Sequence, residues 1–147
     1  MSTLFRRYLT LAVLGSALVG CRRHSNVIDN IKHQLRDGTT QVDIRQSGEF
    51  AWDEMFVFGP YYPKDEICRT LKLSVSQCST TGIKDVDEGE FLLVFMQNDT
   101  VSETESFPRK IADFDESERC QAKRIRRDAA VFTVEHKTGG VYLVCRL

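Results

Sequence analysis

The chain has 147 residues, of which 41% are hydrophobic and 28% are charged, and its formal net charge at pH 7 is −1. This length predicts one domain that can bury a core of its own. A protein whose main partner is nucleic acid needs a net positive surface, so the weakly acidic balance argues against nucleic acid as the partner.

The first 20 residues have the pattern of a secretory signal peptide. Arg6 and Arg7 precede an uncharged run of 13 residues, Tyr8 to Gly20, that is rich in Leu, Ala and Val. A membrane span needs roughly 18 or more apolar residues, so this run is too short to cross a bilayer. A basic head, a short apolar middle and a small-residue exit are typical of a cleaved signal. Without these residues the chain keeps 18 basic and 21 acidic residues, a formal charge of −3.

The segment ends in Leu18-Val19-Gly20-Cys21, which resembles the lipobox of bacterial lipoproteins. The resemblance implies that Cys21 becomes the lipidated first residue, carrying acyl chains such as palmitate that anchor the protein to a membrane. Residues 21–25 would form a tether, whose basic residues suit anionic headgroups. In lipoproteins of diderm bacteria, Asp after the lipidated cysteine favours the inner membrane. Arg22 stands there, so the resemblance implies the outer membrane of the cell envelope, facing the periplasm. The alternative is an ordinary secretory signal with a chance cysteine.

Residues 26–147 are expected to form a single domain that begins with a helix and a short strand. Three aliphatic residues at i, i+3 and i+7 form one apolar stripe between Asn26 and Asp37. Gly38 stands where glycine commonly ends a helix. The alternation over Thr40–Arg45 then predicts a strand.

The most distinctive internal segment is Phe50–Pro63. Its part Trp52–Phe58 is nearly continuous in apolar and aromatic residues, which predicts a strand with at least one buried face. On this strand Phe56 and Phe58 are expected to share one face with Trp52. Trp-Asp, an aliphatic-aromatic run and Phe-Gly-Pro-Tyr together resemble a motif of small, uncharacterised bacterial lipoproteins. That resemblance implies a location and a strand, and it carries no activity.

The remaining segments predict further strands and helices around this one. Short links between the later strands favour antiparallel pairing. The predicted fold is therefore α+β, with an antiparallel sheet of about five strands, helices on one face and disulfide staples. The expected elements are a helix over Pro63–Leu73, a loop over Ser74–Gly82, an acidic turn over Asp85–Glu90, strands over Phe91–Gln97 and Val101–Phe107 joined at Asn98-Asp99, an irregular stretch over Pro108–Asp115, a helix over Ser117–Arg126, and a hairpin of Ala129–His136 with Val141–Leu147.

Five cysteines are present, and lipidation of Cys21 would leave an even number. Four cysteines in an oxidising compartment can close two disulfides, with three possible connectivities. We favour Cys68–Cys78, a local link across one helix end. We also favour Cys120–Cys145, because Cys145 alternates in phase with the apolar residues of the last strand and should face the core.

Few residues suggest catalysis, and no metal or cofactor site is expected. The three histidines lack ligand spacing, the acidic turn around Gly89 departs from the calcium-loop pattern, and no Gly-x-Ser-x-Gly elbow occurs. A reactive thiol at Cys68 competes with the disulfide interpretation. Asp53 and Glu54 could act as acid or base if buried, but two adjacent strand residues more often have structural roles.

A basic cluster near the C-terminus is the strongest surface signal. Its functional interpretation is a patch for an anionic partner such as lipid headgroups, a glycan phosphate or an acidic protein face. The alternative is a solvated helix face that pairs with nearby carboxylates. The cluster consists of Arg119, Lys123, Arg124, Arg126 and Arg127.

These observations favour a non-catalytic interaction module of the cell envelope, held at the membrane by lipid on Cys21, with an unknown envelope protein or glycan as its partner. The rival hypothesis is an envelope hydrolase or enzyme inhibitor that uses a cleft near Trp52–Tyr62. A deep pocket that holds Asp53 or Glu54 against a second polar side chain would favour the enzyme. A flat or convex aromatic face would favour binding.

Overall fold

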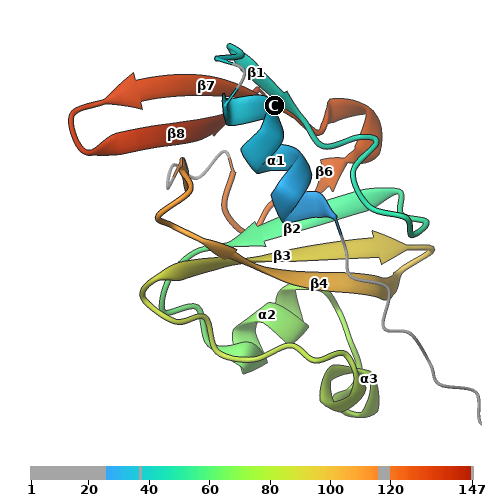
Figure 1. Cartoon of the computed structure of the whole chain (residues 1–147). Coiled ribbons are helices and arrows are strands. Elements are labelled where there is room, and N and C mark those ends of the chain that lie inside the picture. Colours follow the sequence, from blue (N-terminus) through green and yellow to red (C-terminus); the bar gives the residue numbers. More distant parts are fainter. Residues whose placement is uncertain (1–25, 37, 116–119, 147) are drawn as a thin grey trace, which may run out of the picture.

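The computed structural model describes residues 26–36, 38–115 and 120–146 (Figure 1). The expected signal peptide, Cys21, the tether and Arg119 lie outside the described residues. Within the described part, no helix is long and apolar enough to cross a membrane.

The fold is an α+β domain built on two four-stranded sheets, in the orders β1-β7-β8-β5 and β4-β3-β2-β6. This confirms the predicted class, although two sheets of four strands take the place of one sheet of about five. Neighbouring strands are antiparallel except β5 and β8, which are parallel. The elements are α1 (Val27–Arg36), β1 (Gln41–Asp43), β2 (Glu54–Phe58), α2 (Lys64–Thr70), α3 (Val75–Thr80), β3 (Glu90–Gln97), β4 (Thr100–Pro108), β5 (Asp113–Phe114), β6 (Ile125–Arg126), a 3-10 turn η1 (Arg127–Ala129), β7 (Val131–Lys137) and β8 (Gly140–Cys145).

Strand β3 lies at the centre of the molecule and is buried on both faces. Phe91, Leu93 and Phe95 face a core shared with α1 and with the sheet β1-β7-β8-β5. Leu92 and Val94 face a second core, closed by α2 and α3. Two buried faces explain why this strand is apolar throughout rather than alternating.

Helices therefore cover both faces of the sheet β4-β3-β2-β6, not one as expected. Helix α1 buries Val27 and Ile31 in the first core. Helices α2 and α3 cover the opposite face, below the sheet in Figure 1. Because β2 and β3 carry apolar residues on both sides, leaving either face uncovered would expose a large apolar area.

Strand β2 confirms the predicted aromatic strand but corrects the place of Trp52. Phe56 and Phe58 lie in the second core, whereas Trp52 lies in the first, edge-on to Phe95 at 5.2 Å between ring centroids. The regular strand begins only at Glu54, so the two-residue alternation does not extend back to Trp52.

The segment expected as a loop over Ser74–Gly82 contains helix α3. Ser74 caps this helix through a capping box with Gln77, in which each side chain bonds the other residue's backbone N–H. The Ser-x-x-Gln pattern is a known start signal that the prediction overlooked. The helix expected over Pro63–Leu73 forms as α2 but ends at Thr70, and Lys72 has a positive φ of 57°.

The helix expected over Ser117–Arg126 is wrong for its described part. Gln121 forms an isolated bridge to Val57, Ala122 has a positive φ of 54°, and Ile125–Arg126 pair with β2 as strand β6. Residues 116–119 lie outside the described residues. The stretch expected to be irregular over Pro108–Asp115 also contributes the short strand β5.

Several local predictions are confirmed. The Asn98-Asp99 turn between β3 and β4 has both residues at positive φ, 49° and 59°, which suits a tight hairpin. The terminal hairpin β7–β8 forms as expected. Both favoured disulfides are present: Cys68–Cys78 joins α2 to α3, and Cys120–Cys145 joins the segment before β6 to β8.

Candidate functional site

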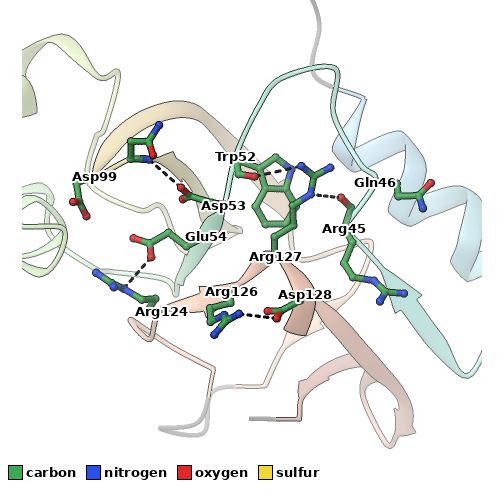
Figure 2. Close-up of a pocket in the computed structure, with 11 residues that line it drawn as sticks. Arg45, Gln46, Trp52, Asp53, Glu54, Asp99, Arg124, Arg126, Arg127 and Asp128 are labelled. Carbon is green, nitrogen blue, oxygen red and sulfur yellow. Dashed lines mark hydrogen bonds and ion pairs between the residues drawn. The ribbon is translucent and has the colours of Figure 1, made fainter.

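A charged groove lies where the start of β2, the β3–β4 turn and the β6–η1 segment meet (Figure 2). Its volume is about 1010 Å³ and it is open to solvent. Four arginines and four carboxylates give it a formal charge near zero but a high density of charge of both signs. The lining residues are Arg45, Gln46, Trp52, Asp53, Glu54, Asn98, Asp99, Arg124, Arg126, Arg127 and Asp128.

Arg127 is held in the groove by the indole of Trp52 and by backbone carbonyls. Its guanidinium carbon lies 5.1 Å from the ring centroid of Trp52, which is only 3% exposed. Its Nε donates to the Arg45 carbonyl at 2.7 Å and its Nη1 to the Trp52 carbonyl at 3.4 Å. Among the described residues no carboxylate pairs with Arg127. The side chain is thus a fixed positive charge, positioned by cation–π and carbonyl contacts.

The two carboxylates singled out from the sequence both have structural partners. Glu54, the first residue of β2, pairs its Oε2 with Nε of Arg124 at 3.0 Å. Asp53 accepts a hydrogen bond from the backbone N–H of Asn98 at 3.1 Å, which ties the β3–β4 turn to the start of β2. Both carboxylates therefore have a structural role in the contacts that the structure describes.

Arg126 and Asp128 form a loose ion pair on the rim of the groove. Their 2.8 Å contact joins side chains that are 76% and 67% exposed. Exposed pairs of this kind contribute only about 0–1 kcal/mol. A charged ligand can replace either partner at little cost, so this pair is the most exchangeable part of the groove.

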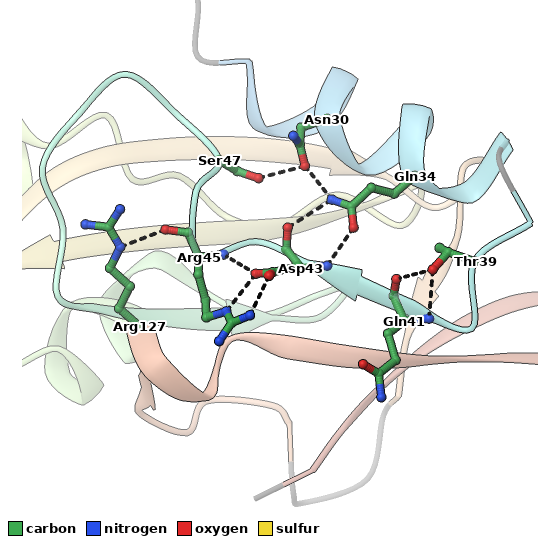
Figure 3. Close-up of polar contacts among 8 residues, drawn as sticks. All are labelled: Asn30, Gln34, Thr39, Gln41, Asp43, Arg45, Ser47 and Arg127. Carbon is green, nitrogen blue, oxygen red and sulfur yellow. Dashed lines mark hydrogen bonds and ion pairs between the residues drawn. The ribbon is translucent and has the colours of Figure 1, made fainter.

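A polar network behind the groove fixes the loop that Arg127 contacts (Figure 3). The Gln34 side chain of α1 makes two hydrogen bonds to the backbone of Asp43, at 2.7 and 2.9 Å. Ser47, which is buried, donates to Asn30 at 2.9 Å. Helix α1 thereby positions the chain from β1 to Ser47, including the Arg45 carbonyl.

Asp43 and Arg45 complete this network through a close ion pair of 2.6 Å. Hydrogen bonds from the Arg45 side chain hold the pKa of the Asp43 carboxyl below its usual value, against a smaller opposing effect of burial. The same contact raises the pKa of Arg45. Arg45 therefore enters the groove already paired, unlike Arg127.

The structure brings three residues of the predicted basic cluster, Arg124, Arg126 and Arg127, to the groove beside Asp53 and Glu54. The exposed Lys123 is not among the lining residues. The expected helix face does not exist here, because these arginines follow an irregular segment into β6 and η1.

Five lining residues are not among the candidate site residues of the sequence: Arg45, Gln46, Asn98, Asp99 and Asp128. They lie in three short segments, and no local pattern indicates that these segments meet. Of the segment Trp52–Tyr62, near which the rival hypothesis expects a cleft, only Trp52, Asp53 and Glu54 line the groove. Tyr62 packs on Phe58 in the second core, at 5.2 Å between ring centroids.

The described residues include no group of three or more His, Cys, Asp or Glu side chains that could hold a metal ion. What the groove can do is contact a ligand that carries charge, through one fixed guanidinium and an exchangeable ion pair. Comparisons with protein-family models, with curated proteins and with solved structures find no match to this chain.

Proposed function

We propose that the protein is a bacterial envelope lipoprotein, anchored through lipid on Cys21, whose folded domain acts as a binding module. The observation that carries the proposal is the pairing of cysteines. The four cysteines of the domain are joined in two disulfides, so Cys21 is the odd one, and it stands at the lipobox position. Disulfides are typical of oxidising, exported settings, which supports a secreted or envelope location.

The charged groove is the proposed contact surface. Arg127 offers a positioned guanidinium, and the Arg126–Asp128 pair can exchange its partners for a ligand's charges. The partner we propose is an envelope protein or glycan that carries charged groups. By resemblance, Arg22 after the lipidated cysteine favours the outer membrane, facing the periplasm.

Binding is favoured over catalysis because the two carboxylates that the sequence singled out as a candidate acid or base have structural partners. Asp53 bonds the β3–β4 turn and Glu54 bonds Arg124. A hydrolase would need a carboxylate free to exchange a proton with substrate. An enzyme inhibitor would act by binding and is included in the proposal.

Affinity capture from envelope membranes tests the groove. The lipidated protein is compared with an Arg126→Ala/Asp128→Ala variant, which alters only exposed side chains. Arg69→Ala, an exposed arginine on α2 away from the groove, is the matched control. We expect a partner that the wild type and the control retain and the groove variant loses. A partner retained equally by all three proteins would remove the groove from the proposal.

A further inference from the structure

Strand β4 is a long edge strand, with no other strand of the described residues beside its outer side. The strand order β4-β3-β2-β6 puts β4 at one side of its sheet, and its nine residues contrast with two or three in the edge strands β1, β5 and β6. In the described part of the chain, β4 makes strand hydrogen bonds only to β3. Proteins usually keep exposed edges short or covered, because an open edge pairs readily with another strand.

The backbone groups that face outward on β4 can be assigned. The N–H of Thr104 donates to the carboxylate of the neighbouring Glu103 at 3.0 Å, so it points away from β3. In an antiparallel ladder every second residue has this orientation, which places the N–H and C=O of Ser106 outward as well. Pro108 occupies the next outward position, where its missing N–H costs no bond to β3. The open edge is centred on Thr104 and Ser106.

The charges of β4 select among possible occupants. The strand contains Glu103 and Glu105 and no basic residue, and both glutamates lie on the same face. Pairing with a second copy through Thr104 and Ser106 would place Glu105 directly opposite its counterpart. Like charges in directly opposed positions destabilise strand pairing. A strand with Lys or Arg at alternate positions would instead meet both glutamates with opposite charge.

We propose that the β4 edge is a docking site for an extended basic segment of a partner protein, which adds as a fifth strand beside β4. Backbone hydrogen bonds to Thr104 and Ser106 would provide affinity, with the Thr104 N–H exchanging its bond to the Glu103 carboxylate for one to the partner strand. The two glutamates would then select basic side chains. This inference goes beyond the proposed function, since it requires neither the lipid nor the charged groove.

The test uses the protein purified from an exporting host with both disulfides formed, and three blocked eight-residue peptides. The first alternates Lys and Thr, the second alternates Glu and Thr, and the third is the Lys-Thr peptide with N-methylated threonines. We expect the Lys-Thr peptide to bind roughly 2- to 30-fold more tightly than the Glu-Thr peptide, from two cross-strand charge pairs. Because N-methylation removes the backbone donors, binding of the third peptide should fall at least tenfold.

Amide hydrogen exchange locates the binding. In the free protein the Ser106 N–H should exchange quickly while those of Glu105 and Phe107, which face β3, exchange slowly. Binding of the Lys-Thr peptide should slow hydrogen exchange of the Ser106 N–H selectively. Glu103→Gln/Glu105→Gln should remove the preference for lysine, whereas Glu66→Gln on α2 should not.

Equal binding of all three peptides, or no binding by any, would overturn the proposal. So would unchanged exchange at Ser106 upon binding. A Ser106 amide that is already protected without peptide would also overturn it, showing the edge covered by a second copy in a dimer or by the chain itself in a monomer. The peptide comparison needs no variant, so a variant that fails to fold leaves the test intact.

Discussion

The two disulfides should contribute unequally to stability, with Cys120–Cys145 the more important. A crosslink removes loop-closure entropy from the unfolded chain, and the loss grows with the number of residues enclosed. The sequence separations are 10 residues for Cys68–Cys78 and 25 for Cys120–Cys145. The loop-entropy relation gives about 2.7 kcal/mol for the short loop and about 3.5 kcal/mol for the long one at 25 °C.

The positions of the bridges make the comparison a fair one. All four bridged cysteines are buried, so replacing either pair with alanine should remove a similar amount of side-chain packing. The longer bridge also joins β8 to the segment that leads into β6, and so connects the two sheets. The loop difference of about 0.8 kcal/mol is therefore a lower estimate of the expected difference.

Urea unfolding of two double variants measures this difference directly. Cys68→Ala/Cys78→Ala and Cys120→Ala/Cys145→Ala each remove a whole bridge, which avoids leaving one buried thiol behind. We expect the second variant to lose at least 0.8 kcal/mol more in free energy of unfolding, about half a molar in urea midpoint at typical m-values. Equal losses, or a greater loss for the short bridge, would refute the reasoning from loop length and sheet connection.

Three further outcomes are expected. Cys21→Ser should release the protein from membranes, as measured by fractionation after a high-salt wash, and retention in the membrane pellet would argue against lipid anchoring. Phe56→Ala should cost about 3–5 kcal/mol in urea unfolding because this ring is buried, whereas Val75→Ala, at a side chain 90% exposed, should cost almost nothing; equal midpoints would place Phe56 at the surface. Asp43→Asn should destabilise the protein at pH 7, because pairing with Arg45 lowers the folded-state pKa of Asp43. That stability is present above the unfolded pKa of about 3.9 and is lost as pH falls through the lower folded pKa, so a variant difference in urea midpoint that persists undiminished at pH 2 would contradict the assignment.

The sequence predicted correctly those elements that are marked by turn residues or by a continuous run of apolar residues. The Asn98-Asp99 hairpin, the terminal hairpin and β3 follow from turn residues and from runs of apolar or β-branched residues. Helix α3 was missed although its Ser74-x-x-Gln77 start signal is present, because the polar composition outweighed the cap. The place of Trp52 was missed because the alternation was extended past the true start of β2.

The groove was only half predictable for a different reason. Arg124, Arg126 and Arg127 stood out as a cluster, and Asp53 and Glu54 as carboxylates within an aromatic strand. That these two groups meet depends on β6 pairing with β2, residues more than 60 positions away in the chain. The two-residue strand β6 is too short for its sequence to indicate which strand it pairs with. The position of the Arg45 carbonyl, which accepts from Arg127, depends in turn on the contact between α1 and β1.

The pairing of β1 with β7 has a consequence for the order in which the protein can fold. Gln41 lies opposite Thr133, so the strand hydrogen bonds of β1 cannot form until β7 is present. Contacts of such long sequence separation slow folding. A chain that emerges N-terminus first, from a ribosome or a membrane channel, cannot close the core between its sheets until nearly all of it has emerged. Until then the face of β3 that carries Phe91, Leu93 and Phe95 stays uncovered, and an exposed apolar strand face of this kind is prone to aggregation.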